Sequence, residues 1–184
     1  MTDPTTFRPL SEIIADGPVS YDRFLELAVP IVEKIDQAHQ IGMAFEQMAE
    51  GVILVDDSND IRITADTVVS DNLTADLKAL GRVFGAMLTG VAAEGAFTRS
   101  TLERIYPYEA RVLVDKLLES HPSGQFLGSS ELLATLREMQ EEYQRSGQIP
   151  AQSARVGSPR VYLVLSLLTL LLLVVWVIYS TLHR

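Results

Sequence analysis

Residues Leu73 to Thr89 constrain the fold most, because their apolar pattern requires a helix that is buried on most of its faces. The large apolar residues recur at spacings of three and four, and small residues fill much of the opposite side. Thr74 is expected to be the N-cap, and Gly90 the left-handed residue just past the end. With 17 residues and the charges of Asp76 and Arg82, the stretch does not fit a membrane span. It predicts the central core helix of a domain around which other helices pack.

The charge of the chain is unevenly distributed over its 184 residues. The net charge is −9, but residues 151–184 contain Arg155, Arg160 and Arg184 and no acidic residue. Residues 1–150 therefore hold 12 basic groups (15 minus 3) against 24 acidic groups, a net charge of −12. Such a surface repels nucleic acid and anionic headgroups, so neither is expected as a ligand of the domain's general surface. The absence of cysteine excludes disulfides, thiolate metal sites and a cysteine nucleophile.

The remaining periodic stretches predict a mainly α domain over residues 10–145 with one small β-hairpin. Helices are expected at residues 10–15, 20–40, 98–105, 108–120 and 129–145. Ser20 is the expected N-cap of the second, and Ser129 or Ser130 of the last. Two β-rich runs, residues 51–55 and 61–64, flank the turn residues Asp56–Asp60 and predict the hairpin. Residues 1–9 are expected to be a disordered or loosely docked lead-in.

The C-terminal part of the chain has the composition of a membrane anchor. Residues 146–159 read as a flexible linker, and Val161 to Leu182 are 22 residues without a charge. As a helix they would be about 33 Å long, enough for the hydrocarbon core of a bilayer. A buried core helix is the alternative, but it would need a second domain to cover it. Because the N-terminus lacks the features of a signal peptide, we expect a single-pass tail anchor over residues 160–182, with residues 1–150 cytoplasmic.

Residues 10 to 140 together resemble the C-terminal lobe of a bacterial serine/threonine protein kinase. The stretch IDQAHQIGMAFEQMAEGVILVDDSNDIRITAD has the layout of the kinase catalytic region: helix end, catalytic loop, hairpin and metal-binding turn. ADLKALGRVFGAMLTG resembles the central helix of the lobe, including the aspartate, here Asp76, that braces the catalytic loop. LLESHP at residues 117–122 and SSELLATL at residues 129–136 resemble the last two helices. The resemblance implies a kinase-like C-terminal lobe, and the predicted anchor is expected to hold it in a bacterial inner membrane.

The positions that carry kinase chemistry have changed. Phe45-Glu46-Gln47 stands where the family has His-Arg-Asp, Val52 replaces the asparagine that holds magnesium, and Ala65-Asp66-Thr67 replaces Asp-Phe-Gly. Asp66, displaced by one place, makes a poor magnesium site alone. The Ala-Pro-Glu sequence and its arginine partner, expected near Gln125, are missing, and so are the Gly-rich loop and lysine strand of the N-lobe. We therefore expect no catalytic, cofactor-binding or metal-ligating residue, and no cofactor.

Other polar signals favour structural roles. Asp56–Asp60 lacks the glycine and the twelfth-position glutamate of a calcium loop, so a solvated hairpin turn is favoured. His39 is expected to be a hydrogen-bonded structural residue, and His121 to lie at a helix end where it interacts with the dipole. Asn72 begins a glycosylation sequon that is irrelevant in a cytoplasmic domain.

These features predict a membrane-tethered, pseudokinase-like protein that is not an enzyme and acts as a protein-interaction or scaffold subunit. Two alternatives stay open: a degenerate kinase with residual nucleotide chemistry, and a structural accessory subunit of a membrane complex with incidental kinase ancestry. The expected partners are proteins at the membrane and the bilayer itself, through Val161 to Leu182. The apolar hairpin, Val52–Val55 with Ile61 and Ile63, needs cover on both faces. A partner protein is the favoured cover, and the lead-in Phe7–Leu10 or a second copy are the alternatives.

Overall fold

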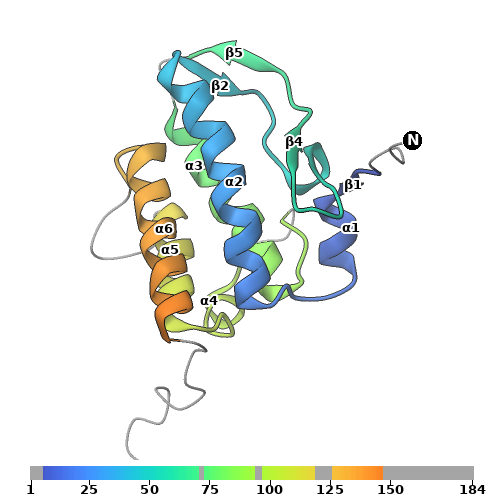
Figure 1. The fold of residues 1–184 in the computed structure, drawn as a ribbon, viewed down its shortest axis with the longest axis vertical. Coiled ribbons are helices and arrows are strands. Elements are labelled where there is room, and N and C mark those ends of the chain that lie inside the picture. The colour runs from blue at the N-terminus through green and yellow to red at the C-terminus, as the bar shows by residue number, and fades with distance from the viewer. Residues whose placement is uncertain (1–5, 71–72, 94–96, 119–125, 147–184) are drawn as a thin grey trace, which may run out of the picture. The chain divides into compact units, whose positions relative to one another are not determined.

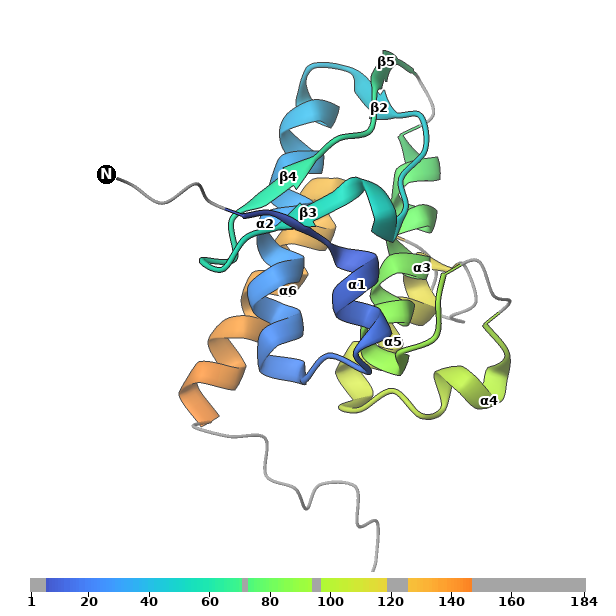
Figure 2. The same ribbon diagram turned by 90° about the vertical axis from the view of Figure 1, so that its right-hand side faces the viewer.

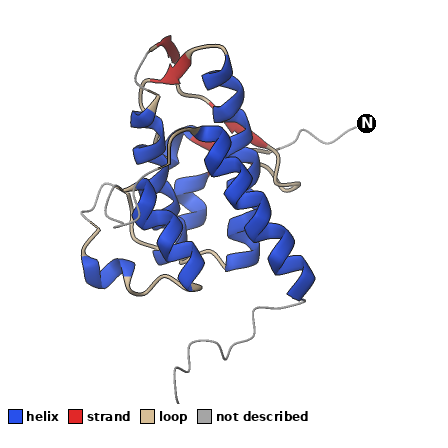
Figure 3. Ribbon diagram, turned by 90° about the vertical axis from the view of Figure 1, so that its left-hand side faces the viewer, coloured by secondary structure: helices blue, strands red, loops and turns tan. Residues whose placement is uncertain are grey.

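A computed structural model describes residues 6–70, 73–93, 97–118 and 126–146, so the predicted linker and anchor lie outside the described residues. Residues Met1–Gly147 belong to one compact unit. The elements in chain order are β1 (Arg8–Pro9), α1 (Leu10–Ala15), α2 (Tyr21–Gln40), β2 (Met43–Phe45), the 3-10 turn η1 (Glu50–Val52), β3 (Ile53–Val55), β4 (Ile61–Ile63), β5 (Thr67–Val69), α3 (Thr74–Thr89), α4 (Arg99–Leu102), α5 (Tyr108–Leu117) and α6 (Ser129–Ser146). Helices dominate, as predicted (Figures 1 and 3).

Helix α3 is the buried core helix that its apolar pattern predicted. Ten of its 16 residues are buried, and Phe84 meets Phe24 of α2 edge to face with ring centroids 5.2 Å apart. Gly90 ends the helix in the left-handed conformation (φ 69°), and its N–H donates to the Ala86 carbonyl. The expected N-cap is wrong by one residue. Leu73 already has helical torsion angles and precedes the helix, so Thr74 is its first residue.

Helices α2 and α6 pack along each other, and α3 packs against α5 (Figure 1). Ser20 is the N-cap residue of α2 in position and backbone conformation, as predicted, but its side chain makes no capping hydrogen bond. Gly42 follows the end of the helix at φ 73°. Ser129 and Ser130 are not N-caps of α6, because the helix already begins at Ser129. The Gly128 carbonyl accepts the first helical hydrogen bond, from the Leu132 N–H at 3.3 Å. The two serine hydroxyls are used across the helix interface instead.

The predicted hairpin is present as β3 and β4, which pair antiparallel with Leu54 opposite Arg62. Its turn is held by Asp56, whose Oδ1 accepts the N–H groups of Ser58 and Asp60 at 2.9 and 2.7 Å, which confirms the hairpin-turn interpretation of Asp56–Asp60. The sequence did not predict the second small sheet, in which β2 and β5 pair antiparallel with Met43 opposite Val69. Strands β2 and β5 are short, and unlike β3 and β4 they are not joined by a short run of turn residues, so no hairpin signal marks their pairing.

The described part of the lead-in, residues 6–9, lies against the hairpin. Strand β1 pairs antiparallel with β3, giving the strand order β1-β3-β4 that Figure 2 shows beside α1. Leu10 is fully buried, and the Arg62 guanidinium lies 4.4 Å from the centroid of the Phe7 ring. Ile53, Val55 and Ile61 are at most 2% exposed within this chain alone. The expectation of a loosely docked lead-in is therefore wrong for residues 6–9, which pair with the hairpin and pack on it. Val52, Leu54 and Ile63 of the hairpin are half-buried, and a partner protein over them stays a prediction.

The segment after α3 follows the prediction in outline. Helix α4 is shorter than the expected residues 98–105, and the Thr98 side chain caps it by accepting the Thr101 N–H at 3.3 Å. Helix α5 begins at Tyr108 as predicted. Among the described residues, none of the helices has the length and hydropathy that crossing a bilayer requires.

Candidate functional site

The segment that corresponds to the kinase catalytic loop begins at β2 and is anchored to the start of α3. The Asp76 carboxylate is 2% exposed, and its Oδ2 accepts the Phe45 N–H at 3.0 Å. A buried carboxylate stabilises such an N–H strongly, because a bond to a charged acceptor is worth more than a neutral one. The predicted bracing of the loop by Asp76 is confirmed for Phe45.

The structure brings the three altered kinase positions into neighbouring loops. The Glu46 N–H donates to the Asp66 carbonyl at 3.0 Å, which joins the Gln47 loop to the segment after the hairpin. The Val52 carbonyl accepts both the N–H and the hydroxyl of Thr64, at 2.9 and 3.1 Å. Gln47 and Asp66 are exposed, and Val52 and Ala65 are half-buried. Within the described ranges, acidic and histidine side chains form no group of three or more that could hold a metal ion.

Glu50 is a further polar residue of this loop, and sequence reasoning missed it. Its side chain is buried, with the residue 8% exposed, and Oε1 accepts the Ala93 N–H at 3.0 Å. It therefore ties the catalytic-loop segment to the chain that follows α3. A single glutamate in a loop carries no pattern that would distinguish it from an exposed one.

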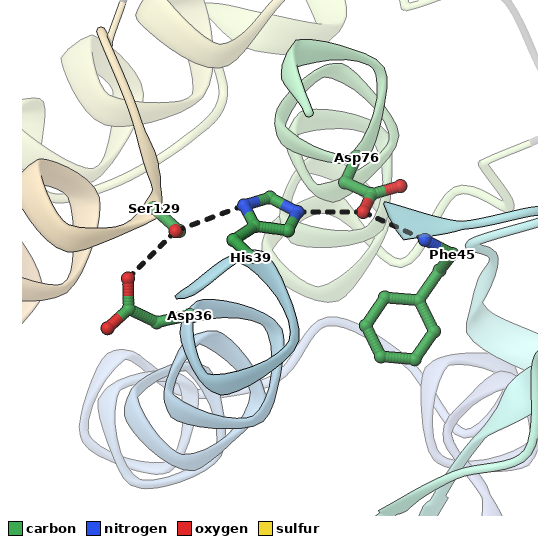
Figure 4. A network of polar contacts seen from close by, with 5 residues as sticks. All are labelled: Asp36, His39, Phe45, Asp76 and Ser129. Carbon is green, nitrogen blue, oxygen red and sulfur yellow. Dashed lines mark hydrogen bonds and ion pairs between the residues drawn. The ribbon is translucent and has the colours of Figure 1, made fainter. Parts of the chain in front are cut away.

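A buried polar network lies where α2, α3 and α6 meet β2 (Figure 4). His39, in the last turn of α2, places Nε2 2.8 Å from the Asp76 Oδ2 and Nδ1 3.0 Å from the Ser129 Oγ. The Ser129 hydroxyl in turn donates to the Asp36 Oδ1 at 2.8 Å. This confirms the prediction that His39 is a hydrogen-bonded structural residue. The network was not predicted, because its members are up to 93 residues apart in sequence.

Asp36 is the acceptor at one end of the network. Its Oδ1 receives the hydroxyls of Ser129 and Ser130, and its Oδ2 receives the Gln40 Nε2 at 2.8 Å. The bond from Ser130, assisted by those from Ser129 and Gln40 and by His39, lowers the pKa of Asp36 against the opposing effect of burial. Asp36 is therefore held as the carboxylate.

Ser129, His39 and Asp76 have the composition of a nucleophilic triad, but not its chemistry. A catalytic serine must reach its substrate and give its proton to the histidine. Ser129 is 3% exposed, and its proton goes to Asp36. The arrangement can position three helices and a strand, and it does not suit acyl transfer. The remaining predicted residues His121, Gln125 and Asn72 lie outside the described residues.

Comparison with known proteins gives a clear likeness in three dimensions. No family model matches the sequence, and no curated protein matches it. A solved structure that does match is the crystal structure of the Rad53 kinase domain and SCD2 in complex with AMPPNP, with a TM-score of 0.60 and 21% sequence identity. The match covers 72% of this chain and 65% of that one, so this chain spans less than two thirds of its neighbour. The likeness shows a kinase-like fold and carries no information on activity.

Proposed function

We propose that this chain is a catalytically inactive, pseudokinase-like module, tethered to a bacterial inner membrane, that binds protein partners as an interaction or scaffold subunit. One observation carries the proposal. The contact that positions a kinase catalytic loop is kept, between Asp76 and the Phe45 N–H at 3.0 Å, while the reactive positions of that loop carry Gln47 and Val52. The scaffold of the site is present without its chemistry.

Each altered position removes a separate part of phosphoryl transfer. The Gln47 amide is too weak a base to accept the proton of a substrate hydroxyl. Val52 and Ala65 have no oxygen in their side chains to bind magnesium, which prefers carboxylate, amide and water ligands. Asp66 is exposed and lies one place from the position of the missing aspartate. Catalysis of phosphoryl transfer depends on positioning and electrostatic stabilisation, and these positions supply neither the base that orients the attacking hydroxyl nor the ligands of the metal ions.

The tether rests on residues 161–182, whose 22 uncharged residues suit a bilayer, and on Arg155 and Arg160, which suit the cytoplasmic side. The binding role is supported by an apolar end of the domain. Ile41, after α2, is 73% exposed, and Val69, on β5, is 88% exposed. The two lie close together, because the Ser70 N–H donates to the Gly42 carbonyl at 3.2 Å. Neighbouring exposed apolar side chains are a common feature of protein-binding surfaces.

The first test is nucleotide binding by the full chain in detergent micelles. We expect millimolar Mg-ATP to leave the melting temperature unchanged, because a ligand stabilises a fold only when it binds the folded state. An active kinase in the same micelles serves as the positive control. A rise of several degrees, or transfer of labelled phosphate to a generic substrate, would contradict the proposal of inactivity.

The second test places a photo-crosslinking residue at Val69 in the full chain, expressed in its native membrane. We expect it to trap a separate polypeptide. The same residue at Asp57, an exposed position on the hairpin turn, is the matched control and should trap little. Equal capture from both positions, or none from Val69, would show that the end of the domain around Ile41 and Val69 is not the binding surface.

A further inference from the structure

The groups that face the two ring nitrogens of His39 indicate which of these nitrogens carry a proton. Nε2 lies 2.8 Å from the Asp76 Oδ2, and the same oxygen accepts the Phe45 N–H at 3.0 Å. An oxygen that already accepts an N–H is well suited to be part of a carboxylate and poorly suited to be the O–H of a neutral acid. Nε2 therefore carries a proton and donates it to Asp76.

The protonation of the second nitrogen, Nδ1, follows from the direction in which the Ser129 hydroxyl donates its single proton. The Ser129 Oγ lies 2.8 Å from the Asp36 Oδ1 and 3.0 Å from the His39 Nδ1. Asp36 is held as a carboxylate by three donors, so it can only accept. The Ser129 hydroxyl donates its proton to Asp36, which leaves oxygen lone pairs facing Nδ1. Nδ1 therefore also carries a proton.

We propose that His39 is an imidazolium in this arrangement, and that it acts as a proton-dependent latch holding the start of α6 to α2 and α3. The charged or titratable side chains around it in the described structure are Asp36 of its own helix and Asp76 of α3. Helix α6 contributes the Ser129 hydroxyl, and β2 contributes its Phe45 N–H through Asp76. The cation thus lies between two anions, one on each side (Figure 4).

Loss of either ring proton breaks the chain of donors. With a neutral ring protonated at Nε2, the Nδ1 lone pair would face the lone pairs of Ser129, unless Ser129 turned its proton away from Asp36. The His39 side chain is 5% exposed and Ser129 is 3% exposed, so the loss of this bond leaves two buried polar atoms facing each other without a proton between them. Deprotonation should therefore release the first turn of α6. This latch is independent of the proposed function, since it requires neither a partner nor the membrane.

The test uses the full chain in detergent micelles with histidine labelled in the ring with ¹⁵N. His121→Gln and His183→Gln leave His39 as the single histidine. Two-bond ¹H–¹⁵N spectra distinguish the imidazolium from both neutral tautomers, and hydrogen exchange of the Leu132 and Leu133 amides reports on the start of α6. Both are recorded from about pH 6 to about pH 9. We expect amide protection to follow the imidazolium fraction, after correction for intrinsic exchange rates. The proposal would be overturned by a neutral His39 at about pH 6, or by amide protection that does not change as His39 loses its proton.

Two serine variants provide the matched comparison. Ser129→Ala removes the acceptor of Nδ1, and we expect about tenfold faster exchange at the start of α6, with its dependence on His39 abolished. Ser130→Ala also removes a hydroxyl from Asp36 but leaves Ser129 and His39 in place, so the dependence should remain. If Ser129→Ala retains the full dependence, the latch does not act through Nδ1. If Ser129→Ala and Ser130→Ala both lose the dependence of amide exchange on His39 protonation to the same extent, the dependence arises from the bonds to Asp36 and the proposal fails.

Discussion

Asp76 is the residue on which the kinase-like arrangement depends most directly. Its Oδ2 accepts from Phe45 and from His39 while the residue is 2% exposed. We predict that Asp76→Ala lowers the free energy of unfolding by about 2–3 kcal/mol, because it leaves the Phe45 N–H and the buried His39 ring nitrogen without their acceptor. Urea unfolding of the full chain in micelles, followed by circular dichroism, measures the change.

Two further variants serve as references for the change measured in Asp76→Ala. Asp66→Ala alters an exposed aspartate of the same region, and its effect should stay within about 0.5 kcal/mol. Asp76→Asn keeps an acceptor oxygen but loses the charge, so its cost should fall between the two. If Asp76→Ala costs no more than Asp66→Ala, the brace contributes nothing to stability.

Asp36 should make stability depend on pH in the acid range. Because its pKa is lowered in the folded state, chiefly by Ser130, its contribution is complete above the ordinary aspartate pKa of about 4 and is lost as the pH falls through the lowered value. Ser130→Ala brings the pKa back toward its ordinary value. We expect the melting temperature of this variant to fall less steeply below about pH 4 than that of the unaltered chain.

The control for this acid-range comparison is Ser146→Ala, at the other end of α6, where the hydroxyl donates to the Tyr143 carbonyl. Its melting temperature should follow that of the unaltered chain at every pH. Parallel curves for Ser130→Ala and the unaltered chain would mean that Ser130 does not influence the ionisation of Asp36.

At the scale of elements, the contact between α3 and α5 depends on a glycine. A Cβ on Gly81 would lie 2.7 Å from the Leu117 Cβ and 3.1 Å from the Leu117 carbonyl carbon, both parts of a packed helix. Alanine should gain about 1 kcal/mol in helix propensity, but overpacking costs about 1–3 kcal/mol. We therefore predict that Gly81→Ala destabilises the domain, as measured by urea unfolding.

Gly85 in the same helix provides the matched variant. Its Cβ would meet the Phe97 ring at 3.1 to 3.4 Å, and this half-buried side chain can shift more readily than a helix backbone. Gly85→Ala should be neutral or stabilising. If Gly85→Ala lowered the free energy of unfolding more than Gly81→Ala, the α3–α5 contact would accommodate an added methyl group more easily than the Phe97 side chain does.

At the scale of the whole molecule, the membrane topology is the principal prediction. Deleting residues 160–184 should release the acidic domain from the membrane fraction, because the deleted residues include the whole uncharged stretch. An N-terminal tag on the full chain should resist protease added outside intact cells. Cleavage of the tag from outside would overturn the cytoplasmic placement, and a truncated chain that stays with the membranes would show another means of attachment.

Much of this fold could be predicted from local patterns in the sequence. The burial of α3, its end at Gly90, the limits of α2 and the β3–β4 hairpin were predictable, because neighbouring residues alone set helical periodicity, left-handed caps and turn chemistry. Asp76 and His39 were assigned their roles correctly from the resemblance and from helix position.

Tertiary structure decided the features that join distant residues. Arg8 and Pro9 show no strand pattern, yet they form β1 because β3 offers an unpaired edge. Ser129 and Ser130 have the composition of N-caps, but they lie within α6 because Asp36, 93 and 94 residues away, takes their hydroxyls. The contacts of His39 likewise join α2 to Asp76 of α3 and Ser129 of α6. A donor bonds to an acceptor that the fold brings within about 3 Å. The separation of two residues in the sequence does not show whether the fold brings them this close.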